Sequence, residues 1–225
     1  MTRFFLIFTV ILFIFNNSYS QWNVKVGYTG IRPKSETLRQ GIRTFNQQFP
    51  DLDNPMEDFV FLHGIELGAR WSAPKVSFEA GWLYGSDKST IAGQNLSDKW
   101  WLSTVSYHAL AELRPRGILG LGGGMAWWDI RMKTDIAFAP KKKKTVVSNA
   151  VWSPIIFISL HLPGERTGLC IRPYYQWNLD VINWNPFENE IYQQFGPEKR
   201  PNHTLEGNMS VIGISVIIYN GPQIN

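Results

Sequence analysis

Two neighbouring segments, 101-WLSTVSYHALAEL-113 and 118-ILGLGGGMAWW-128, decide the fold of this chain. In the first, apolar or aromatic residues occupy nearly every second position, a period typical of a β-strand with one apolar face. The polar residues between them include Thr104, Ser106, His108 and Glu112. Only residues 114–117 separate the segments, and each is long enough to cross a bilayer as a tilted strand. Together they predict a transmembrane β-hairpin.

The same alternation recurs along the chain and predicts eight strands in total. They span residues 22–29, 59–71, 75–85, 101–113, 118–128, 147–162, 169–180 and 208–219. Tight turns are expected at 72–74, 114–116 and 163–165, and long loops at 33–58, 86–98, 133–146 and 182–206. Transmembrane barrels alternate short periplasmic turns with long outer loops in this way. We therefore predict an all-β fold, an eight-stranded antiparallel up-and-down transmembrane β-barrel.

The first 20 residues have the organisation of a cleaved secretory signal peptide. Arg3 precedes an apolar run at 4–15, and Ser18-Tyr19-Ser20 forms a small-x-small cleavage site. We expect residues 21–225 to form a single barrel domain in the outer membrane of a Gram-negative cell.

The composition agrees with a membrane barrel. The 10 tryptophans, 8 tyrosines and 14 phenylalanines suit the aromatic girdles that flank the lipid-facing band of such proteins. The net charge of +4 is mild and gives no signature of nucleic-acid binding. Cys170 is the single cysteine, so no internal disulfide can form.

The alternating strands, with 120-GLGGG-124 and 174-YYQWNL-179, resemble the small outer-membrane barrel superfamily, and within it the PorT-type and OmpA/OmpX-like barrel domains. The resemblance implies an integral outer-membrane protein with a structural or interaction role, such as an accessory of a secretion or envelope complex. Such barrels often finish on an aromatic residue that assists assembly. Here six residues follow Tyr219, which is the candidate for that signal.

Charged residues on the polar strand faces should point into the lumen. The predicted lumen residues are Lys25, Glu66, Arg70, Glu79, His108, Glu112 and Arg172. An eight-stranded barrel is just wide enough for side chains to fill it, and buried charges must pair or be hydrated. We expect a structural network of ion pairs, and a narrow pore is the alternative.

A lipid-modifying enzyme is the other alternative, because Ser106, His108 and Glu112 share the polar face of one strand. Barrels that deacylate lipid A carry a His-x-Ser-Asn string on the outer face, and this chain lacks it. We expect no enzymatic activity and no cofactor. No metal site is predicted either, since His161 and His203 have no partner at a ligand spacing and His63 lies on an apolar face.

The predicted outer loops supply the contact candidates. These are Lys141, Lys142, Lys143, Lys144, Trp184 and Phe187. A lysine run is usually solvated, but here it could meet lipopolysaccharide phosphates. The loop aromatics either anchor a partner or fold over the barrel mouth as a lid. Outer-membrane lipid, lipopolysaccharide and envelope or secretion-complex proteins are the expected partners, with no nucleic acid.

Overall fold

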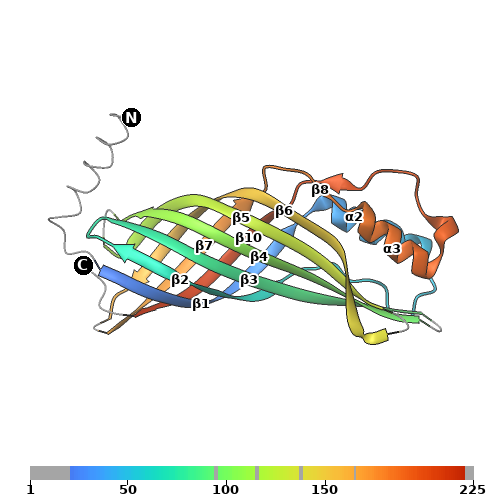
Figure 1. The fold of residues 1–225 in the computed structure, drawn as a ribbon, viewed down its shortest axis with the longest axis horizontal. Helices are drawn as coiled ribbons and strands as arrows, with labels where there is room; N and C mark the ends of the chain where they lie inside the picture. Colours follow the sequence, from blue (N-terminus) through green and yellow to red (C-terminus); the bar gives the residue numbers. More distant parts are fainter. Residues whose placement is uncertain (1–20, 94–95, 115–116, 137–138, 165, 221–225) are drawn as a thin grey trace.

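The computed structural model describes residues 21–93, 96–114, 117–136, 139–164 and 166–220. The chain forms a closed antiparallel barrel of eight strands in the order β1-β10-β7-β6-β5-β4-β3-β2 (Figure 1). These strands are β1 (Gln21–Lys34), β2 (Leu62–Ser72), β3 (Val76–Gly93), β4 (Leu96–Leu113), β5 (Leu119–Ile136), β6 (Ala139–Leu162), β7 (Thr167–Trp177) and β10 (Ser210–Asn220). The predicted fold class is confirmed. The signal-peptide prediction falls on residues 1–20, outside the described part of the chain.

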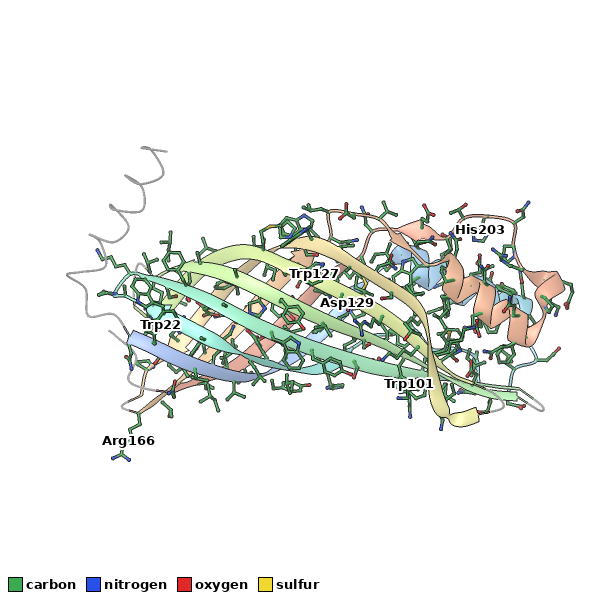
Figure 2. The ribbon with its side chains drawn as sticks, in the orientation of Figure 1. Trp22, Trp101, Trp127, Asp129, Arg166 and His203 are labelled. Carbon is green, nitrogen blue, oxygen red and sulfur yellow. The ribbon has the colours of Figure 1, made fainter. Side chains whose placement is uncertain are left out.

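The outer wall of the barrel carries a band of apolar side chains. In β10, Ile212, Ile214, Val216 and Ile218 are each at least 40 % exposed, as predicted. The residues between them are buried, because successive side chains of a strand point to opposite faces. Figure 2 shows Trp22 at one end of the long axis and Trp127 about halfway along it. The apolar face therefore points away from the lumen, the reverse of a soluble barrel.

Four strands continue well beyond this band. Residues 86–93 and 96–98, predicted as part of a loop, instead extend the paired strands β3 and β4. Residues 133–136 and 139–146 likewise extend β5 and β6. In and beside these extensions the outward residues include polar ones, such as Lys99 and Arg131. The inward residues include the apolar Trp100 and Met132, and also Asp98, which accepts a hydrogen bond from Thr134 at 2.8 Å. The prediction ended each strand where its outward apolar residues stop, which is where the polar surroundings begin.

A compact cap covers the barrel end reached by these extensions. It contains α2 (Glu36–Gln48), α3 (Asn185–Phe195), η1 (Pro197–Lys199) and a two-stranded sheet of β8 (Ile182–Asn183) and β9 (Glu206–Gly207). The segments 33–58 and 182–206, predicted as long loops, do connect barrel strands, but they contain helices and a small sheet that the sequence analysis did not predict. Among the described residues, no helix is long and apolar enough to cross a membrane.

Local sequence explains where α2 lies. The Ser35 hydroxyl caps its first turn by accepting a hydrogen bond from the Leu38 amide at 3.3 Å. Leu38, Ile42 and Phe45 recur at helical spacing and are all buried. This apolar stripe turns α2 towards the barrel mouth.

The cap and the half of the lumen nearest to it, the upper lumen, share one apolar core. The Trp100 ring of β4 meets the Phe187 ring of α3 edge-on, with centroids 5.1 Å apart. Phe45 of α2 packs edge-on against Tyr192 of α3 at 5.7 Å. The core continues downward through Leu62, Leu102, Trp128, Ile130 and Val151. The barrel mouth is therefore filled with apolar side chains.

Candidate functional site

The lower lumen, which is the half nearer the tight turns, holds the main cluster of charged side chains. The structure places all seven predicted lumen residues there, and none is more than 6 % exposed. They come from β1, β2, β3, β4 and β7, so the closed sheet brings together residues that lie up to 147 positions apart, Lys25 and Arg172. Buried charges of both signs then satisfy one another.

Glu79 of β3 is the hub of this cluster. Arg172 binds it with two parallel hydrogen bonds, from Nη1 to Oε2 at 2.9 Å and from Nη2 to Oε1 at 2.6 Å. Lys25 Nζ donates to Oε2 at 2.9 Å, and Arg70 Nη1 lies 3.2 Å from Oε1. The Tyr219 hydroxyl donates to Oε1 at 3.0 Å. One carboxylate thus holds three cations from three other strands, the strong, geometrically specific kind of ion pairing.

Glu112 organises a second group closer to the turn end. Arg70 Nη2 lies 2.8 Å from Glu112 Oε2, so Arg70 links the two groups. His161 Nε2 lies 2.6 Å from Glu112 Oε1, and Ser159 also donates to that oxygen. Ser77 donates to Oε2 at 3.1 Å. No lumen role was predicted for His161 or Ser159, although both occupy inward positions of β6.

Tyr219 is also a lumen residue. Its ring is fully buried, Arg70 stacks over it at 4.9 Å, and Arg172 donates to its hydroxyl at 2.9 Å. The predicted outward placing of Ile218 already implied that Tyr219 points inward. Its part in assembly stays a prediction.

Two glycines make room for the contact between Lys25 and His108. Lys25, Gly68, Gly81 and His108 lie side by side on four consecutive strands. A Cβ at Gly68 would lie 2.7 Å from Lys25 Cε, and one at Gly81 would lie 2.5 Å from His108 Nε2. Lys25 Nζ therefore reaches His108 Nε2 at 3.1 Å, and since an ammonium group only donates, that ring nitrogen accepts.

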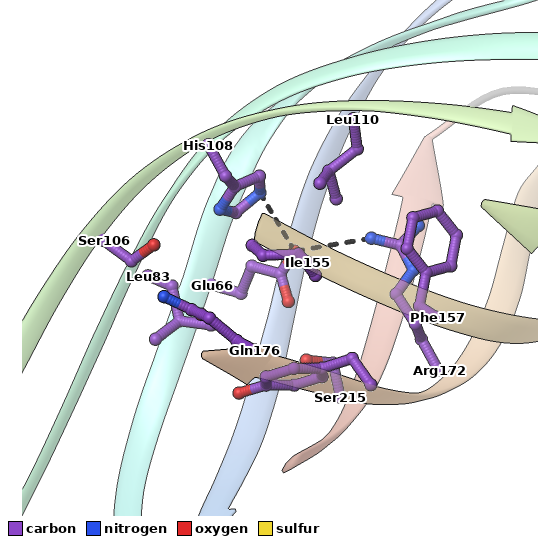
Figure 3. A pocket seen from close by; sticks show the side chains of 11 residues that line it. Glu66, Leu83, Ser106, His108, Leu110, Ile155, Phe157, Arg172, Gln176 and Ser215 are labelled. Carbon is purple, nitrogen blue, oxygen red and sulfur yellow. Dashed lines mark ion pairs between the residues drawn. The ribbon is translucent and has the colours of Figure 1, made fainter. Parts of the chain in front are cut away.

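Little open space remains in the lumen. Figure 3 shows Glu66 between His108 and Arg172, at 3.5 and 3.7 Å. The cavity beside them measures about 20 Å³, room for about one water. Above it lie the apolar residues of the mouth.

The serine-based catalytic alternative gains no geometric support. Ser106 Oγ has no hydrogen-bond partner among the described residues, whereas His108 Nε2 is held by Lys25. His161 does contact Ser159 at 3.1 Å, but this group is buried within the ion-pair network. Within the described chain, no group of three or more His, Cys, Asp or Glu residues is placed to hold a metal ion.

The outer-loop contact candidates lie elsewhere than predicted. The lysine run belongs to strand β6, where pairing with β5 continues past the membrane band. Lys143 lies 3.8 Å from the centre of the Trp101 ring, and Lys144 pairs with Glu190 of α3 at 2.6 Å. The side chains of Lys141 and Lys142 lie outside the described set.

Trp184 and Phe187 are buried in the cap, with at most 1 % exposure. They are therefore not exposed anchors for a partner. They belong to a lid over the barrel mouth, which was the other predicted alternative.

The remaining histidines have different surroundings. His63 lies on the outer wall, as predicted, with Nδ1 2.5 Å from the Tyr28 hydroxyl. His203 in the cap lies 3.4 Å from Glu188, a buried carboxylate of α3. Burial raises the pKa of the Glu188 carboxyl above its ordinary value.

Known proteins resemble this chain in structure but not in sequence. No protein-family model and no curated protein matches the chain. The solved structure of Ail, the attachment invasion locus protein of Yersinia pestis, in complex with the heparin analogue sucrose octasulfate, is similar with a TM-score of 0.50 and 10% identity. The match covers 88% of this chain and 98% of that one. Neisserial surface protein A matches with a TM-score of 0.46 and 8% identity, over 89% of this chain and 97% of that one.

At such identities the likeness concerns the fold. The closed eight-stranded sheet, its outward apolar band and the similarity to Ail agree with one another. The chain has the fold of the small eight-stranded outer-membrane β-barrels.

Proposed function

We propose that the protein is an integral outer-membrane barrel that holds a folded cap at the cell surface and serves a structural or interaction role. The observation that carries this proposal is that both halves of the lumen are filled with side chains. Ion pairs around Glu79 fill its lower half, and the apolar core shared with the cap fills its mouth. A barrel closed in this way supports a rigid platform better than a passage.

The same observation argues against the two alternatives. A pore needs a continuous hydrated path, and an enzyme needs a nucleophile that a substrate can reach. The polar groups of this lumen are buried and mostly engaged with one another. We therefore propose a protein that neither conducts ions nor catalyses a reaction.

The cap is the proposed contact surface for an envelope or secretion-complex protein. It is a folded structure of two helices and a small sheet beyond the membrane band, whereas the opposite end has tight turns, such as that between Ser72 and Val76. Lipopolysaccharide is the proposed lipid partner. Lys88, Trp101 and Lys133 lie side by side on the outer face of β3, β4 and β5, beyond the band, where lipid phosphates would meet them.

Cell fractionation and electrophoresis test the proposal. The protein should sediment with the outer membrane and migrate faster unheated than heated, since a closed barrel resists detergent unfolding. Recovery as a soluble periplasmic protein would contradict it. In planar bilayers the purified barrel should add no single-channel steps, and regular steps would favour the pore instead.

A further inference from the structure

The barrel wall has one weak seam, between β6 and β7. Six residue pairs join these strands in the described chain, fewer than at any other seam. Pairing stops after Phe157 and Tyr174 and resumes at Leu160 and Ile171, and Pro173 lies in the gap. Proline has no amide hydrogen to donate, and Pro173 remains paired with β10 on its other side. The missing hydrogen bond therefore falls at the seam.

An apolar groove of about 270 Å³ runs along this interruption on the outer wall. Its rims are formed by Leu121, Ile156, Ile158, Pro173 and Tyr175, most of them exposed. These residues belong to the band that faces lipid. An acyl chain is the group that fits a groove of this chemistry in that position.

A second, more polar groove of about 480 Å³ lies directly above and shares Ile156 and Tyr175 with the first. Lys34, Ser210 and Trp177 line it as direct neighbours on β1, β10 and β7. The rings of Tyr175 and Trp177 are stacked, with centroids 5.5 Å apart. The two grooves thus form one continuous path from the apolar band to its polar edge.

The upper groove offers three kinds of contact. Lys34 is exposed and has no ion-pair partner within the described chain, so its ammonium group is available to an anion. Asn208 and Ser210 add an amide and a hydroxyl at the rim. The stacked aromatic rings offer a flat surface for the apolar face of a sugar ring.

We propose that this groove binds one phosphorylated glycolipid of the outer leaflet, with an acyl chain along Pro173 and the sugar phosphate between Lys34 and Trp177. The inference rests on the proposed membrane location and adds a specific site to it. A phospholipid with the same acyl chains would fill the lower groove. In the upper groove, however, a phospholipid would offer no sugar hydroxyls to pair with the Asn208 amide and the Ser210 hydroxyl.

Native mass spectrometry of the purified, full-length barrel in detergent tests the proposal, with lipid A and phosphatidylglycerol as probes. We expect one retained lipid A, bound more tightly than phosphatidylglycerol. Lys34→Gln should weaken lipid A binding about tenfold, the effect of one lost charge-assisted contact. Trp177→Leu should weaken lipid A binding selectively, and Ile158→Trp, which fills the lower groove, should weaken binding of both lipids.

Lys75→Gln is the matched control, because Lys75 is an exposed lysine at the turn between β2 and β3 and lines neither groove. It should leave lipid A binding unchanged. Equal affinity for the two lipids, or equal losses from Lys34→Gln and Lys75→Gln, would overturn the proposal. Variants are compared only when their heat-modifiable mobility is intact. A folded outer-membrane barrel that retains no glycolipid would refute the groove and leave the proposed function standing.

Discussion

At the scale of single residues, Glu79 offers the sharpest test of the lumen network. Glu79→Gln would leave Lys25, Arg70 and Arg172 buried without their shared carboxylate. Removing one partner of a buried ion pair costs about 3–5 kcal/mol of unfolding free energy. Urea unfolding in lipid vesicles, followed by tryptophan fluorescence, measures this loss. The exposed Glu36→Gln should change stability by less than about 1 kcal/mol, and equal effects would mean that the network adds no stability.

Glu188 provides a test of pH dependence in the cap. Its pKa is raised by burial, so the folded cap favours the protonated carboxyl. This stabilising contribution is complete below the unfolded-state pKa and is lost as pH rises through the folded-state pKa. Glu188→Gln should therefore slow hydrogen exchange in α3 at pH 8 more than at pH 4, compared with the unsubstituted protein at each pH. A difference that is the same at both pH values would contradict this assignment.

At the scale of elements, strand β7 tests which face meets lipid. Ile171 lies outward near the middle of β7, beside Val216 of β10 and Leu160 of β6. Ile171→Arg should cost about 2–4 kcal/mol, the penalty for arginine at the bilayer midplane. Thr167→Arg, on the same face at the strand end, should cost about 0–1 kcal/mol. Equal penalties in vesicle unfolding would show that the two positions do not differ in membrane depth.

At the scale of the whole molecule, the two ends of the barrel should face different compartments. Figure 2 shows His203 at the cap end and Arg166 at the turn end. In a Cys170→Ala background, His203→Cys should react with an impermeant maleimide on intact cells. Arg166→Cys should react only after the outer membrane is permeabilised. The opposite pattern would place the cap in the periplasm and remove it as a cell-surface contact.

The sequence by itself determined the barrel, the number of its strands and the direction of the side chains on clearly alternating strands such as β2, β3 and β7. These properties follow from a period of two, which is local, and from lipid as the outer solvent. Lipid requires apolar outward residues such as Ile171, so the lumen positions of Glu66 and Arg172 followed from parity alone.

Only the tertiary structure decided the strand extensions and the cap. Beyond the membrane the surroundings become polar, so Trp100 faces inward and Lys99 outward, and the alternation no longer marks a lipid-facing strand. The helices α2 and α3 have 13 and 11 residues, a length at which helices depend on packing against a core that distant segments supply. The pairing of Glu112 with His161, and the groove at Pro173, depend on register and closure, because each joins strands that meet only in the folded barrel.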